Sequence, residues 1–190
     1  MYKLLIVILF VLMIIIISWH QPPIRYWIEN SPIDRSFQQQ VREILQMSKW
    51  HKYHNFYETD KRHLADIKIF LKSPDELKHL YTHKKYYPNG KEIQFSFTVQ
   101  SKTKPPVIYI NSKNWLNGVP ESGLTLRQYR EYVINHEFGH ALSYDHQPCK
   151  HTSRCPVMYQ STIGCPTGIQ CGYQPSAIDL TKKISNAYFN

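Results

Sequence analysis

Two histidines and a glutamate occur at a spacing that can support metal-assisted hydrolysis. The segment reads His136-Glu137-Phe138-Gly139-His140. On a helix, residues four apart lie on one face about one turn apart, so both imidazoles can reach a single ion. A glutamate beside the first ligand can take a proton from a metal-activated water and pass it to a leaving amine. The pattern predicts a catalytic zinc site with Glu137 as general base.

The third ligand is expected to be His146, six residues after His140. This separation is too long for one face of a continuing helix, so the chain must turn after Leu142. Three histidines leave a fourth position open for water, as a catalytic zinc requires. Asp145 is the alternative third ligand.

The elements that must position these residues can be read from capping and periodicity. Thr125-x-x-Gln128 is a capping-box pattern and predicts that the histidine-bearing helix begins there. A second such pattern, Ser176-x-x-Asp179, predicts a last helix. A further helix is expected within residues 36–50, and strands are expected at 67–71, 93–99 and 107–110. This order predicts a single α+β domain.

The four cysteines lie close together, between residues 149 and 171. An even number of cysteines behind an apolar leader is typical of disulfides formed in an oxidising compartment. We expect two disulfides among Cys149, Cys155, Cys165 and Cys171, and the residues alone leave three pairings open. A structural zinc knot is the alternative, but such sites favour shorter spacings between ligands.

The leader is an unbroken apolar run from Leu4 to Ile17. We expect residues 1–19 to be an uncleaved signal anchor that crosses a membrane as a helix, with a cleaved signal peptide as the alternative. Residues 20–35 contain three prolines and are expected to be a tether, and 36–190 to be the catalytic domain. We therefore expect a single-pass membrane protein whose catalytic domain is luminal or extracellular.

Composition excludes some classes of protein. Hydrophobic residues make up 42% of the chain, which is incompatible with wholesale disorder. The net charge is +9, and the excess of basic residues lies mainly in residues 49–91. A solvated face is the preferred interpretation, with anionic headgroups or acidic substrates as alternatives. No nucleic-acid partner is expected, because no binding motif accompanies the charge. The 16 lysines against 7 arginines suit an AT-rich genome, so a viral membrane is one candidate location.

The motif resembles that of the metzincin class of zinc metalloproteases. Their pattern is H-E-x-x-H-x-x-G-x-x-H followed by a methionine-containing turn. The chain carries it from His136 to His146 at all positions but the glycine, and Met158 in Cys-Pro-Val-Met-Tyr-Gln occupies the position of that turn. Over about residues 37–171 the chain also resembles an uncharacterised metzincin-like domain family of actinobacterial exported proteins.

The resemblance implies a zinc endopeptidase with a small mixed sheet, an active-site helix, a Met-turn and a C-terminal helix. It implies one catalytic zinc ion and a protein or peptide substrate. Tyr109, Ile110 and Asn111 would lie on an antiparallel edge strand that pairs with the substrate, although an interior strand is the alternative. It also suggests the pairing Cys149–Cys165 and Cys155–Cys171, with two local loops, 149–155 and 165–171, as the alternative.

One residue departs from the metzincin pattern. The family glycine between the second and third ligands is Ser143 in this chain. A serine in the left-handed region costs about 1–2 kcal/mol, so the turn either changes shape or carries strain. Two other functions stay open: a zinc amidase acting on non-protein amides, and a catalytically silent binding module stabilised by zinc. The oligomeric state is not predicted.

Overall fold

A computed structural model describes residues 22–80, 95–150, 153–184 and 188–189 of the chain. Within them the strands form one mixed five-stranded sheet in the order β2-β1-β3-β5-β4. Neighbouring strands are parallel except for β4, which is antiparallel to β5. The predicted α+β class is confirmed. The strands are β1 (Ile24–Ile28), β2 (Phe56–Glu58), β3 (Ile67–Lys72), β4 (Phe97–Val99) and β5 (Val107–Asn111).

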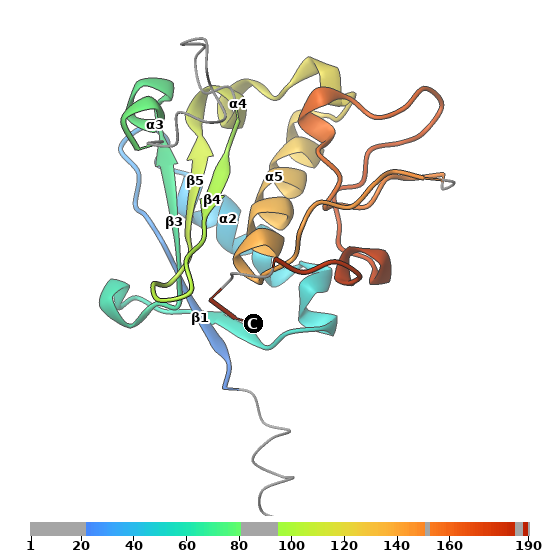
Figure 1. The fold of residues 1–190 in the computed structure, drawn as a ribbon. Coiled ribbons are helices and arrows are strands. Elements are labelled where there is room, and N and C mark those ends of the chain that lie inside the picture. The colour runs from blue at the N-terminus through green and yellow to red at the C-terminus, as the bar shows by residue number, and fades with distance from the viewer. Residues whose placement is uncertain (1–21, 81–94, 151–152, 185–187, 190) are drawn as a thin grey trace, which may run out of the picture.

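The helices pack mainly on one face of this sheet (Figure 1). The core between them is made by inward-facing strand residues such as Ile69 and Ile110 and by Phe138 of the histidine-bearing helix, all of them fully buried. The α-helices are α2 (Phe37–Gln46), α3 (Pro74–Leu80), α4 (Ser112–Asn117) and α5 (Leu126–Ala141). The 3₁₀ turns are η1 (Lys49–Lys52), η2 (Arg62–Leu64), η4 (Pro120–Ser122), η5 (Ser161–Ile163) and η6 (Ala177–Leu180).

Helix α5 begins where its capping box predicts. The Thr125 hydroxyl accepts from the Gln128 backbone N–H, and the Gln128 side chain accepts from the Thr125 N–H. Most of the helix is buried, because it lies between α2 on one side and strands β4 and β5 on the other. Its last two turns carry the residues of the motif.

The predicted tether at residues 20–35 is wrong in its middle. Ile24–Ile28 form β1, which lies inside the sheet between β2 and β3. Tyr26 and Ile28 alternate into the core, whereas the prolines flank the strand at 22, 23 and 32 and do not interrupt it. A strand of five residues shows too little alternation to stand out between prolines. The folded domain therefore begins before residue 36.

The predicted C-terminal helix is also wrong. The capping box between Ser176 and Asp179 is present, but it opens only the short 3₁₀ turn η6. The Asp179 carboxylate is buried and also accepts a hydrogen bond from the Met158 backbone N–H. Beyond η6 the chain extends to pair Lys183 with Tyr144, so these tertiary contacts replace a helix.

The membrane prediction is corrected as well. In the parts of the chain that the structure describes, no helix has both the length and the apolar character needed to cross a membrane. The predicted anchor at residues 1–19 lies outside the described residues. The assignment as a single-pass membrane protein is therefore not retained, and the two disulfides described below are what remains of the evidence for an oxidising compartment.

Helix α5 ends with a left-handed serine. Ser143 has φ of 75°, and in the described residues it is the one non-glycine residue with positive φ. The Tyr144 N–H bonds to the Gly139 carbonyl and the Ser143 N–H bonds to the His140 carbonyl, which is the Schellman pattern. The Ser143 side chain is completely buried, and its hydroxyl has no hydrogen-bond partner among the residues that the structure describes. The turn thus keeps the shape that glycine favours, and the serine carries strain.

Ser143→Gly is expected to stabilise the protein. Glycine removes the left-handed strain and the unpaired hydroxyl, and after its greater freedom in the unfolded chain is subtracted the gain is about 1 kcal/mol. The melting temperature should rise by about 2–4 °C in a calorimetric scan. Ser143→Ala is the control, because it removes the hydroxyl and keeps the strain. A glycine variant that melts below wild type would contradict this account of the turn.

Candidate metal centre

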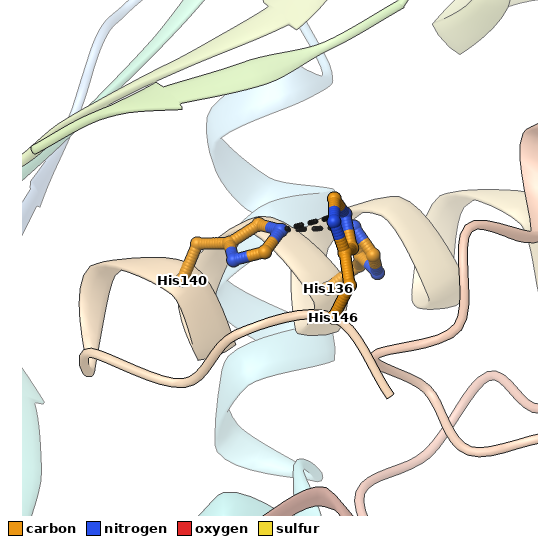
Figure 2. Close-up of side chains that lie close together, drawn as sticks. All are labelled: His136, His140 and His146. Atoms are coloured by element: carbon orange, nitrogen blue, oxygen red, sulfur yellow. Dashed lines mark hydrogen bonds between the residues drawn. The ribbon is translucent and has the colours of Figure 1, made fainter. Parts of the chain in front are cut away.

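Three histidine side chains converge at the end of α5 (Figure 2). The Nε2 atom of His140 lies 3.2 Å from the Nε2 of His136 and 3.2 Å from the Nε2 of His146. His136 and His140 come from successive turns of α5, and His146 comes from the segment that follows the left-handed turn. The structure therefore brings together the three residues predicted as ligands, and this group could hold a metal ion.

The opposite ring nitrogens explain why these Nε2 atoms are free to bind a metal. His136 Nδ1 donates to the Val157 carbonyl at 2.7 Å, and His140 Nδ1 donates to the Tyr144 carbonyl at 2.8 Å. With the protons on Nδ1, neither Nε2 can donate to the other, so two lone pairs face each other. A cation between them relieves this repulsion.

The spacing also fits zinc. Two nitrogens that each lie about 2.0–2.1 Å from a tetrahedral zinc are about 3.3 Å apart. The two Nε2 separations of 3.2 Å are close to this value. Three imidazoles at these positions leave room for one further ligand in a tetrahedral arrangement.

Burial keeps His136 and His140 in the neutral form that binds metals. Desolvation lowers the pKa of His136 well below its usual value, and the neighbouring histidines add to the effect. The pKa of His140 is lowered to about 4, again mainly by burial. Burial also lowers the pKa of His146, although Asp145 opposes the shift. At neutral pH no proton competes strongly for these nitrogens.

The alternative ligand Asp145 is engaged elsewhere. Its carboxylate accepts from the His146 backbone N–H at 2.7 Å and pairs with Lys182 Nζ at 2.8 Å. These contacts direct Asp145 toward the C-terminal segment and leave His146 as the residue that reaches the other two histidines.

Glu137 lies beside this group, 5% exposed. Its carboxylate Oε2 accepts a hydrogen bond from the Thr98 hydroxyl at 2.7 Å. Burial raises the pKa of Glu137 to about 7, and the bond from Thr98 opposes the shift. A buried carboxyl group with a pKa near neutrality is suited to accept and release a proton.

Met158 packs against α5 at Gly139, the residue before His140. It is fully buried in a tight turn that closes from Tyr159 N–H to the Pro156 carbonyl. The preceding residue of this turn, Val157, provides the carbonyl that orients His136. Gly139 is required for this packing, because a Cβ there would collide with the Met158 sulfur. The predicted Met-turn is therefore in contact with the helix of the motif.

The histidines and Glu137 open into a cleft of about 580 Å³. One wall is strand β4, which is the edge of the sheet within the described residues. The other wall comes from the segment after Met158. In addition to the histidines and Glu137, the lining residues include Phe95, Ser96, Phe97, Thr98, Gln100, Tyr132, Val133, Gln160 and Thr162.

The predicted edge strand is wrong. Tyr109, Ile110 and Asn111 lie on β5, which is hydrogen-bonded to β3 on one side and to β4 on the other. β4 covers this side of β5 from Val107 to Tyr109, so β5 is an interior strand there, and Ile110 and Asn111 are buried. Asn111 instead caps α4 through its side chain. The strand beside the cleft is β4.

Two cleft residues were not identified from the sequence. Thr98 lies in the predicted strand 93–99, and nothing in the alternation signals that it faces Glu137; residues 93–94 lie outside the described residues. Gln160 follows Met158 by two residues and lines the cleft. Their roles depend on contacts between distant segments, which no local pattern carries.

The disulfide pairing suggested by the resemblance is wrong. The bonds are Cys149–Cys155 and Cys165–Cys171, each between residues six apart. Both segments fold back within this distance, so the Cα atoms approach to 4.8 and 5.6 Å, which is within disulfide range. The first bond joins the segment that leaves His146 to the segment that enters the Met158 turn.

The comparisons with known proteins place the chain in a family. A family described as "Protein of unknown function (DUF3152)" matches residues 29–176, most of the chain, so the protein belongs to this family. The matched region contains the three histidines, Glu137 and Met158. No curated protein matches the chain.

Metal content should identify the third ligand. The purified protein is expected to bind one divalent ion, and His146→Ala should lower its affinity by at least 10-fold, because a nitrogen donor is lost. Asp145→Ala should keep full stoichiometry. Both are measured by elemental analysis and chelator competition. Full metal binding by His146→Ala, together with loss in Asp145→Ala, would show that the third ligand is Asp145.

The two disulfides should differ in their effect on the metal centre. Because both close loops of equal length, removing either should cost a similar free energy of unfolding, about 2 kcal/mol. Replacing Cys149 and Cys155 by serine should also weaken metal binding, because that bond joins the His146 and Met158 segments. Replacing Cys165 and Cys171 by serine is the matched control. Equal metal affinities in the two double variants would contradict a role for the first bond at the site.

Proposed function

We propose that this protein is a zinc-dependent endopeptidase of the metzincin type. The observation that carries the proposal is the convergence of three histidine Nε2 atoms beside a buried glutamate, inside a cleft. The Met158 turn, which packs against α5 at Gly139 and bonds to His136 through Val157, is a second feature of that class and supports the resemblance read from the motif. The family description itself gives no function.

Zinc is the proposed ion because three neutral imidazoles with an open fourth position are typical ligands of catalytic zinc. Zinc held by His136, His140 and His146 would lower the pKa of a water molecule toward about 7 and polarise a carbonyl oxygen. The hydrogen bonds from His136 and His140 to backbone carbonyls fix the orientation of both rings.

Glu137 is the proposed general base and acid. A carboxylate with a pKa of about 7 can accept a proton from the attacking water and return it to the leaving amine. Its burial keeps bulk water from competing for that proton. Glu137 lines the same cleft as the three histidines, so its carboxyl group can reach a water molecule bound there.

The cleft supports a peptide as substrate. Strand β4 pairs with β5 and lies along the cleft wall, where an extended chain could lie beside it. The cleft lining beyond the histidines and Glu137 is aromatic, aliphatic or neutral polar. Such a wall accepts the backbone of a peptide together with uncharged side chains.

Glu137→Gln tests the reaction. The substitution keeps the size of the side chain but removes its ability to accept a proton, so kcat should fall by roughly 10²–10⁴-fold while metal content stays unchanged. Hydrolysis is measured on quenched-fluorescent peptide pools with zinc-loaded protein. Glu131→Gln is the matched control, because Glu131 lies earlier on α5 outside the cleft lining.

Three outcomes would contradict the proposal in different ways. Full activity of Glu137→Gln would exclude the glutamate as general base. Cleavage of glycan-linked amides but of no peptide would indicate a zinc amidase. Stoichiometric zinc binding with no hydrolysis of any amide would indicate a silent binding module.

A further inference from the structure

The Thr98 hydroxyl contacts two oxygens of the same residue. Its Oγ1 lies 2.7 Å from the carboxylate Oε2 of Glu137 and 3.0 Å from the backbone carbonyl oxygen of Glu137. In the described part of the chain, no other side chain donates a hydrogen bond to this carboxylate. The proposed general base is therefore held by a single hydroxyl group from a different element.

Strand alternation directs Thr98 toward α5. Successive residues of a strand point to opposite faces. Phe97 packs its ring against Tyr109 of β5, with the centroids 5.4 Å apart, and Thr98 points the other way, to Glu137. Gln100, two residues later, also faces α5 and donates to the His140 carbonyl. Thr98 is thus part of a contact between the edge strand and the helix that bears the motif.

A hydroxyl group can serve this glutamate before and after it takes up a proton. It has one proton to donate and two lone pairs that accept. Toward an ionised Glu137 it can donate to Oε2, which is a strong, charge-assisted bond. A carboxyl group that has taken a proton on its other oxygen still accepts this bond at Oε2, now as a neutral hydrogen bond. Both arrangements use the observed positions of the heavy atoms.

We propose that Thr98 is a positioning residue for the general base, which holds Oε2 of Glu137 in place and leaves the second carboxylate oxygen for the reacting water. This inference rests on the proposed peptidase function. In this proposal Thr98 acts through Glu137 and does not contact the scissile bond. Its loss should therefore slow turnover more than it weakens substrate binding.

The test compares Thr98→Val, which keeps the shape and removes the hydroxyl, with Thr98→Ser, which keeps the hydroxyl. In the full-length, zinc-loaded protein, Thr98→Val should lower kcat roughly 10- to 100-fold, the effect of losing one hydrogen bond to a buried charge. KM should change by less than about 3-fold. Thr98→Ser should restore kcat to within about 3-fold of wild type.

Thr59→Val is the matched control. Thr59 directly follows β2, at the opposite edge of the sheet, and its hydroxyl accepts a hydrogen bond from the Lys61 backbone N–H. The same change of side chain there should leave kcat and KM unaltered. Zinc content and melting temperature are measured for all variants, so that an unfolded or metal-free variant is recognised.

The outcomes separate this inference from the proposed function. Suppose that wild type cleaves peptides and Glu137→Gln does not. A kcat of Thr98→Val equal to that of wild type would then overturn the role of Thr98 alone. So would a kcat of Thr98→Ser as low as that of Thr98→Val. If wild type cleaves no peptide, the proposed function fails, and crystal structures of wild type and Thr98→Val decide the positioning role. An unmoved Glu137 carboxylate in the valine variant would then overturn it.

Discussion

The close approach of unprotonated imidazole nitrogens is the constraint on which the rest of this structure depends. Two Nε2 atoms 3.2 Å apart, each with its Nδ1 proton engaged by a carbonyl, are unfavourable without a cation. Holding them there requires rigid surroundings. The Val157 carbonyl comes from the Met158 turn and the Tyr144 carbonyl from the turn that ends α5. The C-terminal segment holds both turns. Asp179 accepts a hydrogen bond from the Met158 N–H, and Lys183 pairs with Tyr144.

Local patterns predicted the parts of the site that lie on one element. The capping box at Thr125 located the start of α5, and the spacing of His136 and His140 placed both on one face of it. At Ser143 the loss of the motif's glycine left two outcomes open, a turn of another shape or a strained one, and the structure has the strained, left-handed turn. In each case the interaction involves residues only a few positions apart.

Features that depend on distant segments could not be predicted in the same way. Strand order is set by packing across the whole sheet, so the sequence could not show that, among the described strands, β4 and not β5 comes last. The contact of Thr98 with Glu137 joins residues 39 positions apart. The Ser176 capping box was read correctly as a local bond, but burial of Asp179 against Met158 decided that no helix follows. The disulfide pairing failed because it was inferred from a relative and not from this chain's turns.

The position of β1 sets how far the N-terminal side of the chain can be trimmed. Strand β1 bonds to β2 on one side and to β3 on the other. A fragment that starts at residue 36 would keep every residue of the metal centre and of the cleft, yet β2 and β3 would have no strand between them. Proteolysis between Ile28 and Phe37 would also remove β1 from the sheet if the released strand dissociated. The segment that looks most dispensable in the sequence is therefore one that an intact folded fragment has to include.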